Sequence, residues 1–261
     1  MKLFIILIFF VVFTSLLFGQ YIFSQNLTTV DTNYGQLYLQ KGKDFLAKEL
    51  LDEALTAFDL SLQNSKKDNN LIVDIYELKG DTLFQLGKYK EANQNYDLAL
   101  AKIEPGTNND KLFRLYVLKG HALVNTGDYD EALKFFRKAI EIQPNNPSLY
   151  FLLGTLNEKK ENNTGALTEY QRAIVASSVN SHDTLNSTLY FSKANILIKL
   201  SEFERGLQEF DKIIKFDPNN TKVYYDKGNT LFNLGRYHEA LESFTQAFKG
   251  NGGSYYDVIL E

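Results

Sequence analysis

The sequence contains no cysteine and no tryptophan, and only four prolines and three histidines among its 261 residues. The absence of cysteine excludes disulfide bonds, thiolate zinc sites and thiol catalysis. None of the three histidines stands at metal-ligand spacing from a second histidine or a carboxylate in a pattern that exceeds chance. The net charge of −4 gives no bulk attraction to nucleic acid, for which a strongly basic face is expected.

Motifs of catalytic and nucleotide sites are also missing. No serine lies in a nucleophile-elbow motif. The segment GDTLFQLGK at residues 80–88 has the wrong spacing between its glycines for a phosphate loop. The segment that begins at Asp217 lacks the central glycine and the acidic oxygens of a calcium loop. We therefore expect that the protein is not an enzyme and uses no cofactor.

The N-terminal segment differs from the rest of the chain. Residues 1–24 carry one lysine, Lys2, before an apolar run from Leu3 to Phe18. This pattern predicts either a signal peptide cleaved after Ser24 or a membrane anchor over residues 3–23, which is about long enough to span a bilayer. No basic residue follows until position 41, so the positive-inside rule places the body of the chain outside the cytoplasm in both cases. Residues 25–34 are expected to form a linker.

Small residues recur at regular intervals through the body of the chain. The spacings between successive ones are 38, 40, 34, 40 and 34 residues, so the base unit is 34 with insertions of four or six. We call these residues the markers: Gly42, Gly80, Gly120, Gly154, Ala194 and Gly228. Internal periods of roughly 20–50 residues are typical of stacked repeat architectures.

Four further columns keep register with the markers. A tyrosine stands four residues before each of them: Tyr38, Tyr76, Tyr116, Tyr150, Tyr190 and Tyr224. A small residue stands twelve residues after: Ala54, Ala92, Ala132, Ala166, Gly206 and Ala240. An aromatic residue stands sixteen residues after: Phe58, Tyr96, Phe136, Tyr170, Phe210 and Phe244. The column nineteen residues after holds Ser61, Ala99, Ala139, Ala173, Ile213 and Ala247.

The columns predict two helices in each repeat. Offsets of three and four residues place the tyrosine, the marker and a following leucine on one face of the first helix. The alanine and aromatic columns give the second helix one apolar face. Glycine in the connecting turns, at Gly87, Gly127 and Gly235, fits a left-handed helix cap. Pro144 and Pro218 end two of the second helices, because proline cannot continue a helix.

These residues resemble the tetratricopeptide repeat, whose 34-residue signature has an aromatic, a small residue, then alanine, an aromatic, alanine and proline. The resemblance covers residues 35–250, most clearly in the third and sixth repeats. It implies an all-α, right-handed superhelical stack, or α-solenoid, of six helix-turn-helix hairpins preceded by the N-terminal hydrophobic helix. The six repeats span about 35–70, 73–110, 113–146, 147–186, 187–220 and 221–250.

The insertions and the C-terminus complete the expected organisation. The insertions fall between one repeat's second helix and the next repeat's first, where they lengthen loops or extend helices by a turn. Residues 251–261 form a C-terminal tail that either caps the last hairpin or stays frayed.

The resemblance also implies where a ligand binds, since the first helices of this family line a concave face. Its outward stripe includes the positions six and three residues before the marker and one after it. In the N-terminal half this stripe is charged or polar: Asp74, Glu77, Asp81, Arg114, His121 and Asn125. In the C-terminal half it pairs aromatic with polar residues: Phe151, Thr155, Phe191, Asn195, Tyr225 and Asn229. The alternative is that the aromatics pack against a neighbouring repeat.

The sequence therefore predicts a non-enzymatic scaffold or adaptor that binds a peptide or partner protein in a groove. It is expected to act outside the cytoplasmic membrane, anchored or secreted, without nucleic acid. Two alternatives stay open: a structural, self-assembling module and a regulatory subunit of an envelope enzyme complex.

Overall fold

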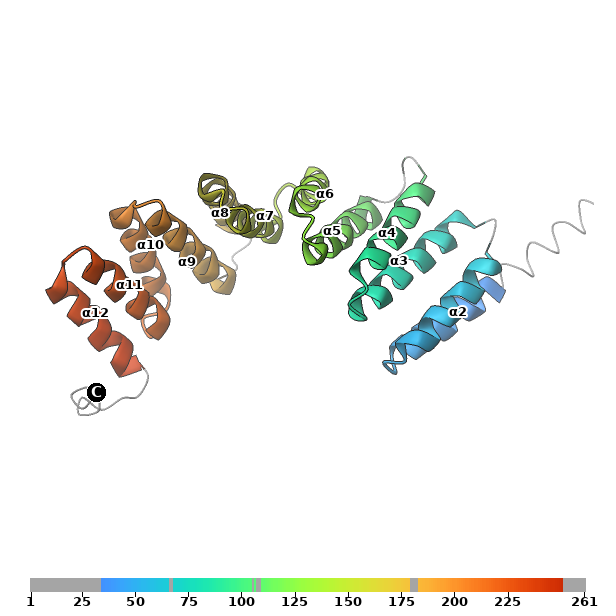
Figure 1. Ribbon diagram of the computed structural model, residues 1–261, viewed down its shortest axis with the longest axis horizontal. Coiled ribbons are helices and arrows are strands. Elements are labelled where there is room, and N and C mark those ends of the chain that lie inside the picture. Colours follow the sequence, from blue (N-terminus) through green and yellow to red (C-terminus); the bar gives the residue numbers. More distant parts are fainter. Residues whose placement is uncertain (1–33, 66–67, 105, 107–108, 179–182, 251–261) are drawn as a thin grey trace, which may run out of the picture. The chain divides into compact units, whose positions relative to one another are not determined.

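The computed structural model describes residues 34–250, apart from 66–67, 105, 107–108 and 179–182. All regular elements of this described part are helices, which confirms the expected all-α repeat fold (Figure 1). A helix over residues 34–46 precedes α2 (Leu51–Gln63), α3 (Asn69–Gln85), α4 (Tyr89–Lys102), α5 (Asn109–Thr126), α6 (Tyr129–Ile142), α7 (Pro147–Lys159), α8 (Asn163–Ser178), α9 (Asp183–Lys199), α10 (Phe203–Phe216), α11 (Thr221–Asn233) and α12 (Tyr237–Gly250).

Both ends of the chain carry predictions that lie outside the described residues. These are the hydrophobic segment and residues 25–33 of the predicted linker at the N-terminus, and the tail over residues 251–261. Residue 34, the last of the predicted linker, already belongs to a helix. Across the described helices, no stretch combines the length and the apolar character needed to cross a bilayer.

The chain divides into two compact units, residues 1–135 and 136–261, with the boundary inside α6. In the N-terminal unit α3 packs against α4, and each second helix packs against the next first helix, α2 on α3 and α4 on α5. In the C-terminal unit α7–α8, α9–α10 and α11–α12 form hairpins, joined by contacts of α8 with α9 and of α10 with α11. This successive packing buries an apolar face that one hairpin cannot bury alone.

Marker glycines allow the two helices of a hairpin to touch. A Cβ added at Gly42, Gly80, Gly154 or Gly228 would lie 2.3–2.6 Å from a ring carbon of the aromatic residue sixteen positions later. Phe58, Tyr96, Phe136, Tyr170 and Phe210 in that aromatic column are at most 1% exposed. These four marker positions therefore require glycine, because the aromatic ring of the second helix occupies the space that a side chain would need.

In the fifth repeat the glycine that allows the close approach lies in the second helix instead of the first. Its marker is Ala194, and glycine stands in the second helix at Gly206. A Cβ on Gly206 would lie 2.9 Å from Ile198 Cγ1 and 3.2 Å from the carbonyl oxygen of Ala194. The close approach thus moves from the first helix to the second, which explains the exchange of the two small residues.

All six connecting turns place one residue in the left-handed region, seven positions after the marker. Gly87, Gly127 and Gly235 fill it as expected, with φ of 73°, 85° and 74°. The other repeats use Glu49, Glu161 and Ser201, with φ of 59°, 59° and 63°. The turn geometry is therefore common to all repeats, although only three of them carry the glycine that favours it.

The sequence insertions lengthen first helices. The helices α3, α5 and α9, which follow the insertions, have 17, 18 and 17 residues. The first helices α7 and α11, which follow no insertion, have 13 residues each. Four or five extra residues correspond to about one helical turn, so of the two expected outcomes, longer loops or longer helices, the helices are extended.

Lysines immediately before four markers join consecutive repeats. Each binds the side chain seventeen residues after the preceding marker. Lys79 pairs with Asp59, Lys119 with Asp97 (2.7 Å), Lys193 with Gln171 (2.5 Å) and Lys227 with Asp211 (2.7 Å). We call this set the lysine column. At the third junction the same two sequence positions hold Leu153 and Arg137 instead.

The fourth repeat departs from the usual apolar pattern at Asn157, which is nevertheless buried. Its amide nitrogen donates to the carbonyl oxygen of Leu153 (2.9 Å), and its amide oxygen accepts from Asn162 (2.9 Å). Asn162 in turn accepts from the backbone N–H of Gly165 at the start of α8 (3.1 Å). A hydrogen-bonded pair of asparagines, Asn157 and Asn162, thus stands where the repeat pattern has an apolar contact.

Candidate functional site

The predicted stripe lies on the first helices of both units. In the N-terminal unit its residues come from α3 and α5, and in the C-terminal unit from α7, α9 and α11. Each of the two sets belongs to a compact body of its own.

Charged residues of the N-terminal set bind one another across repeats. Glu77 is 5% exposed and accepts a hydrogen bond from the Arg114 guanidinium (2.8 Å). Asp74 pairs with Lys111 at the start of α5. Burial raises the pKa of Glu77, while Arg114 acts in the opposite direction. Two of the three carboxylates predicted to form an acidic patch therefore help to hold α3 against α5.

Asp81 behaves differently from these two acids. It accepts a hydrogen bond from the Tyr96 hydroxyl on α4 (2.8 Å) and forms no salt bridge within the described residues. Burial raises its pKa, and the Tyr96 hydrogen bond and the Arg114 charge lower it by smaller amounts. The carboxylate thus sits in a partly desolvated place without a paired cation.

A hollow of about 370 Å³ opens beside Asp81 between α3, α4 and α5. Its lining residues are Asp81, Phe84, Gln85, Tyr96, Leu118 and His121. Burial lowers the pKa of His121, because desolvation disfavours the charged imidazolium. The Asn125 amide donates to the backbone carbonyl of His121 (2.9 Å) on the exposed side. The structure therefore joins the predicted Asp81 and His121 in one pocket.

Aromatics of the C-terminal set rest on the aromatic column of their own repeats. Ring centroids of Phe151 and Tyr170 lie 5.7 Å apart, and those of Phe191 and Phe210 lie 5.9 Å apart. Both Phe151 and Phe191 are half-buried. Phe151 and Phe191 also pack against core clusters that include residues of the next repeat. Both rings therefore contribute to packing, within a repeat and between repeats.

The sixth repeat exposes its aromatic residue most. Tyr225 contacts Phe244 with a centroid distance of 5.8 Å, yet 55% of it remains accessible to solvent. The Lys222 ammonium on α11 lies 4.4 Å from the ring centroid of Phe191 on α9. This contact places the stripe residues of the fifth and sixth repeats on adjoining first helices.

The polar residues of the C-terminal set differ in whether their side chains already make a hydrogen bond within the protein. The Thr155 hydroxyl donates to the backbone carbonyl of Phe151 (3.0 Å). The side-chain amides of Asn195 and Asn229 are half-buried and make no hydrogen bond within the described residues. Each amide has a donor and an acceptor to offer to a ligand.

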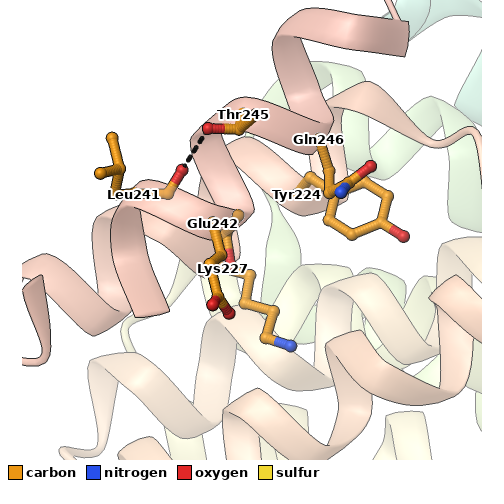
Figure 2. Close-up of a pocket in the computed structure, with 7 residues that line it drawn as sticks. Tyr224, Lys227, Leu241, Glu242, Thr245 and Gln246 are labelled. Carbon is orange, nitrogen blue, oxygen red and sulfur yellow. Dashed lines mark hydrogen bonds between the residues drawn. The ribbon is translucent and has the colours of Figure 1, made fainter. Parts of the chain in front are cut away.

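A second depression, of about 470 Å³, lies on the last hairpin and is lined by residues of α11 and α12. Figure 2 shows Tyr224 and Lys227 from α11 beside Leu241, Glu242, Thr245 and Gln246 from α12. The Thr245 hydroxyl donates to the carbonyl oxygen of Leu241 (2.7 Å). Neither Tyr225 nor Asn229 lines it, so this depression does not contain the predicted stripe.

The sequence pattern does not reveal several contributors to these sites. It assigns Tyr96 only to the hairpin core, although the Tyr96 hydroxyl reaches Asp81. Lys111 lies in the extra turn of α5, outside the 34-residue pattern. Phe84 and Leu118 stand four residues after and two before a marker, beside the stripe rather than on it. The position of the stripe thus indicates the surface but not the walls of the pocket.

Comparison with protein families finds three matching models, all of tetratricopeptide repeats. A model described as "TPR repeat" matches residues 120–161, and one described as "Tetratricopeptide repeat" matches residues 209–242. A further tetratricopeptide-repeat model matches residues 73–101 and 187–220. The matches fall in the second to sixth predicted repeats. No curated protein matches the chain.

Solved structures with the same fold include other repeat proteins of low sequence identity. The C-terminal part of a TPR repeat-containing protein from Cytophaga hutchinsonii aligns with a TM-score of 0.67 at 16% identity, covering 84% of this chain and 81% of that one. MamA from Desulfovibrio magneticus RS-1 gives 0.56 at 19%, covering 69% and 95%. YrrB, described as a TPR protein with an unusual peptide-binding site, gives 0.55 at 24%, covering 74% and 92%.

Proposed function

Because the chain belongs to the tetratricopeptide-repeat family, we propose that it is a non-enzymatic scaffold that binds a peptide or partner protein along its first helices. The observation that carries this proposal is the stripe of α9 and α11. There the exposed Tyr225 stands one helical turn before Asn229 on α11, and Asn195 holds the equivalent position on α9. Neither amide makes a hydrogen bond within the described residues. The unusual peptide-binding site of YrrB, a protein of the same fold, supports the proposal.

The stripe suits an extended segment of polypeptide. Each asparagine can donate to a backbone carbonyl and accept from a backbone N–H of the ligand at once. An aromatic side chain in a partly desolvated position provides the apolar contact typical of binding anchors. The net charge of −4 gives no bulk attraction to nucleic acid, which supports a protein or peptide as the partner.

Paired amide substitutions test the groove. Asn195→Ala with Asn229→Ala should reduce the amount of partner captured from solubilised membranes of the source organism, measured by quantitative mass spectrometry. Loss of two ligand hydrogen bonds corresponds to about a tenfold drop in affinity. Phe191 is a poorer target because it packs against Phe210.

The matched control removes two exposed amides from second helices, Gln208→Ala with Gln246→Ala. This variant should capture the same partners as the wild type. Equal capture by both double variants would contradict the groove assignment.

We also propose that the protein acts outside the cytoplasmic membrane, held there by residues 3–23 or released after cleavage. Lys2 and the apolar run that follows it support this location. Alkaline phosphatase fused after residue 34 should be active in a bacterial host, because it folds only after export. An inactive fusion, with an active green fluorescent protein fusion at the same position, would place the body inside.

A further inference from the structure

We propose that the hollow between α3, α4 and α5 binds a cationic side chain, with arginine preferred over lysine, from the segment held by the scaffold. The inference rests on the proposed function, because it takes the first-helix stripe to be the binding surface. It adds the chemistry of one ligand residue and the groups that recognise it.

The size of the hollow suits a single long side chain. Its volume of about 370 Å³ is at the lower end of the roughly 300–1,000 Å³ typical of ligand pockets. Three helices contribute to it, with Asp81, Phe84 and Gln85 on α3, Tyr96 on α4, and Leu118 and His121 on α5. Packing of these helices within one compact unit fixes the walls.

The charge in the hollow favours a cation. Asp81 accepts one hydrogen bond, from Tyr96, and has no salt bridge among the described residues. Arg114, whose charge acts on Asp81, binds Glu77 instead, and Lys111 binds Asp74. An inserted guanidinium would add charge-assisted hydrogen bonds and a positive charge to the single hydrogen bond that this partly desolvated carboxylate accepts from Tyr96.

The walls fit the rest of such a side chain. Leu118 and Phe84 offer apolar surface to its methylene groups, as long cationic side chains commonly cover apolar surface with their stems. The half-buried Phe84 ring can contact the cation. The Gln85 amide oxygen gives a planar guanidinium, with its five donors, a second acceptor besides the carboxylate.

Other occupants fit less well. An apolar side chain would bury the Asp81 carboxylate further without compensation. A metal ion would need more ligands, since no group of three or more His, Asp or Glu side chains suited to a metal occurs in the described part of the chain. An anion would face the Asp81 charge directly.

Selection from a random-peptide phage library tests the pocket with the full chain in detergent. Wild-type protein should enrich peptides with arginine, and less strongly lysine, at one fixed position. Asp81→Asn should lose that enrichment and keep the preferences at other positions. Asp52→Asn, an exposed acid on α2, serves as the matched control and should select the same peptides as wild type.

A second experiment changes the peptide instead of the protein. A selected peptide with arginine replaced by citrulline, which keeps the shape and removes the charge, should bind wild-type protein about tenfold more weakly. The same change should have little effect on binding to Asp81→Asn, so that the two losses are not additive. The citrulline measurement on wild-type protein needs no change in the protein, so a folding defect cannot imitate that loss of affinity. Binding of the arginine peptide to Asp81→Asn through its other residues shows that the variant is folded.

The possible outcomes separate the two proposals. Peptides selected without a basic preference would overturn the pocket assignment and leave the scaffold function standing. An equal effect of citrulline on wild-type and Asp81→Asn protein would also overturn it. Selection of no peptide at all would contradict the scaffold function and the pocket with it.

Discussion

The two units place side chains at the same positions of their first helices but use them in opposite ways. In the N-terminal unit Glu77 and Asp74 are paired with Arg114 and Lys111. In the C-terminal unit the amides of Asn195 and Asn229 have no hydrogen bond within the described residues. Charged side chains on neighbouring repeats find each other, because an unpaired buried charge is costly, whereas neutral amides at a partly open surface stay available. A stripe inferred from sequence is therefore only a candidate surface until the partners of its residues are known.

The largest loss of stability is expected at the marker glycines, a feature that the two units share. Gly80→Leu and Gly154→Leu should each destabilise the protein by about 3 kcal/mol, because even a Cβ would lie 2.4–2.5 Å from the ring of Tyr96 or Tyr170. Thermal unfolding followed by circular dichroism measures the change. Wild-type stability in either variant would show that the hairpin crossing is misplaced in that unit.

The next prediction separates the units. Arg114→Ala should lower the free energy of unfolding by about 2 kcal/mol at pH 7, because it leaves the buried Glu77 carboxylate without its cation. This figure is below that for fully buried pairs, since Arg114 itself is exposed. Asn195→Ala, measured by the same urea titration, should stay within about 0.5 kcal/mol of wild type.

The Arg114→Ala effect should also depend on pH. Burial raises the pKa of Glu77 in the folded state, so the folded protein binds its proton more tightly than the unfolded chain does. Removal of the cation raises this pKa further, and the variant loses stability as pH rises above the ordinary glutamate value of 4.5 through the folded-state pKa. The difference from wild type should therefore shrink as pH falls towards 4.5. An unchanged difference would mean that Glu77 is not the group responsible.

A smaller effect is expected in the lysine column. Lys119 is 4% exposed, binds Asp97 and Asn93, and lies 4.7 Å from the ring centroid of Phe135. A double-mutant cycle of Lys119→Met with Asp97→Asn should give a coupling of about 1 kcal/mol. The cycle of Lys227→Met with Asp211→Asn should give less, because Lys227 is more exposed. Equal couplings would show that burial of the lysine does not matter.

The smallest gain or loss of stability is expected for a glycine introduced at one of the turns. Glu161→Gly should stabilise the protein by about 0.5 kcal/mol, since its φ of 59° lies in the region that glycine adopts most readily. Gly87→Ala, in the equivalent turn of the N-terminal unit, should destabilise it by about 1 kcal/mol. Melting temperatures of the two variants should move in opposite directions.

Much of the fold could be predicted because its determinants lie within a single repeat. The marker and the aromatic residue sixteen positions later are in contact, and both recur in the sequence. The left-handed turns at Glu49, Glu161 and Ser201 could not be predicted from residue type, because packing of the flanking helices imposes a conformation that these residues do not favour.

Less of the candidate site could be predicted because it depends on contacts between repeats. Whether Glu77 faces a ligand or Arg114 is decided by the register between α3 and α5, which are 37 residues apart at this contact. The pocket beside Asp81 depends on side chains from three helices, and only Asp81 and His121 among them belong to the stripe. The position of a residue within a repeat determines whether its side chain lies on the predicted stripe. Contacts with the neighbouring repeat determine whether that side chain remains available to a ligand.

The lysine column also bears on how the chain unfolds. In a linear array, cooperativity depends on the coupling between nearest neighbours, so the weakest coupling sets where the array divides. Four junctions use a lysine at the position before the marker, and the third has Leu153 there and Arg137 at the position of its partner. The boundary between the two compact units falls within the same repeat as Arg137. The chain is therefore expected to unfold as two cooperative blocks of about three repeats each, with an intermediate in which one block is still folded.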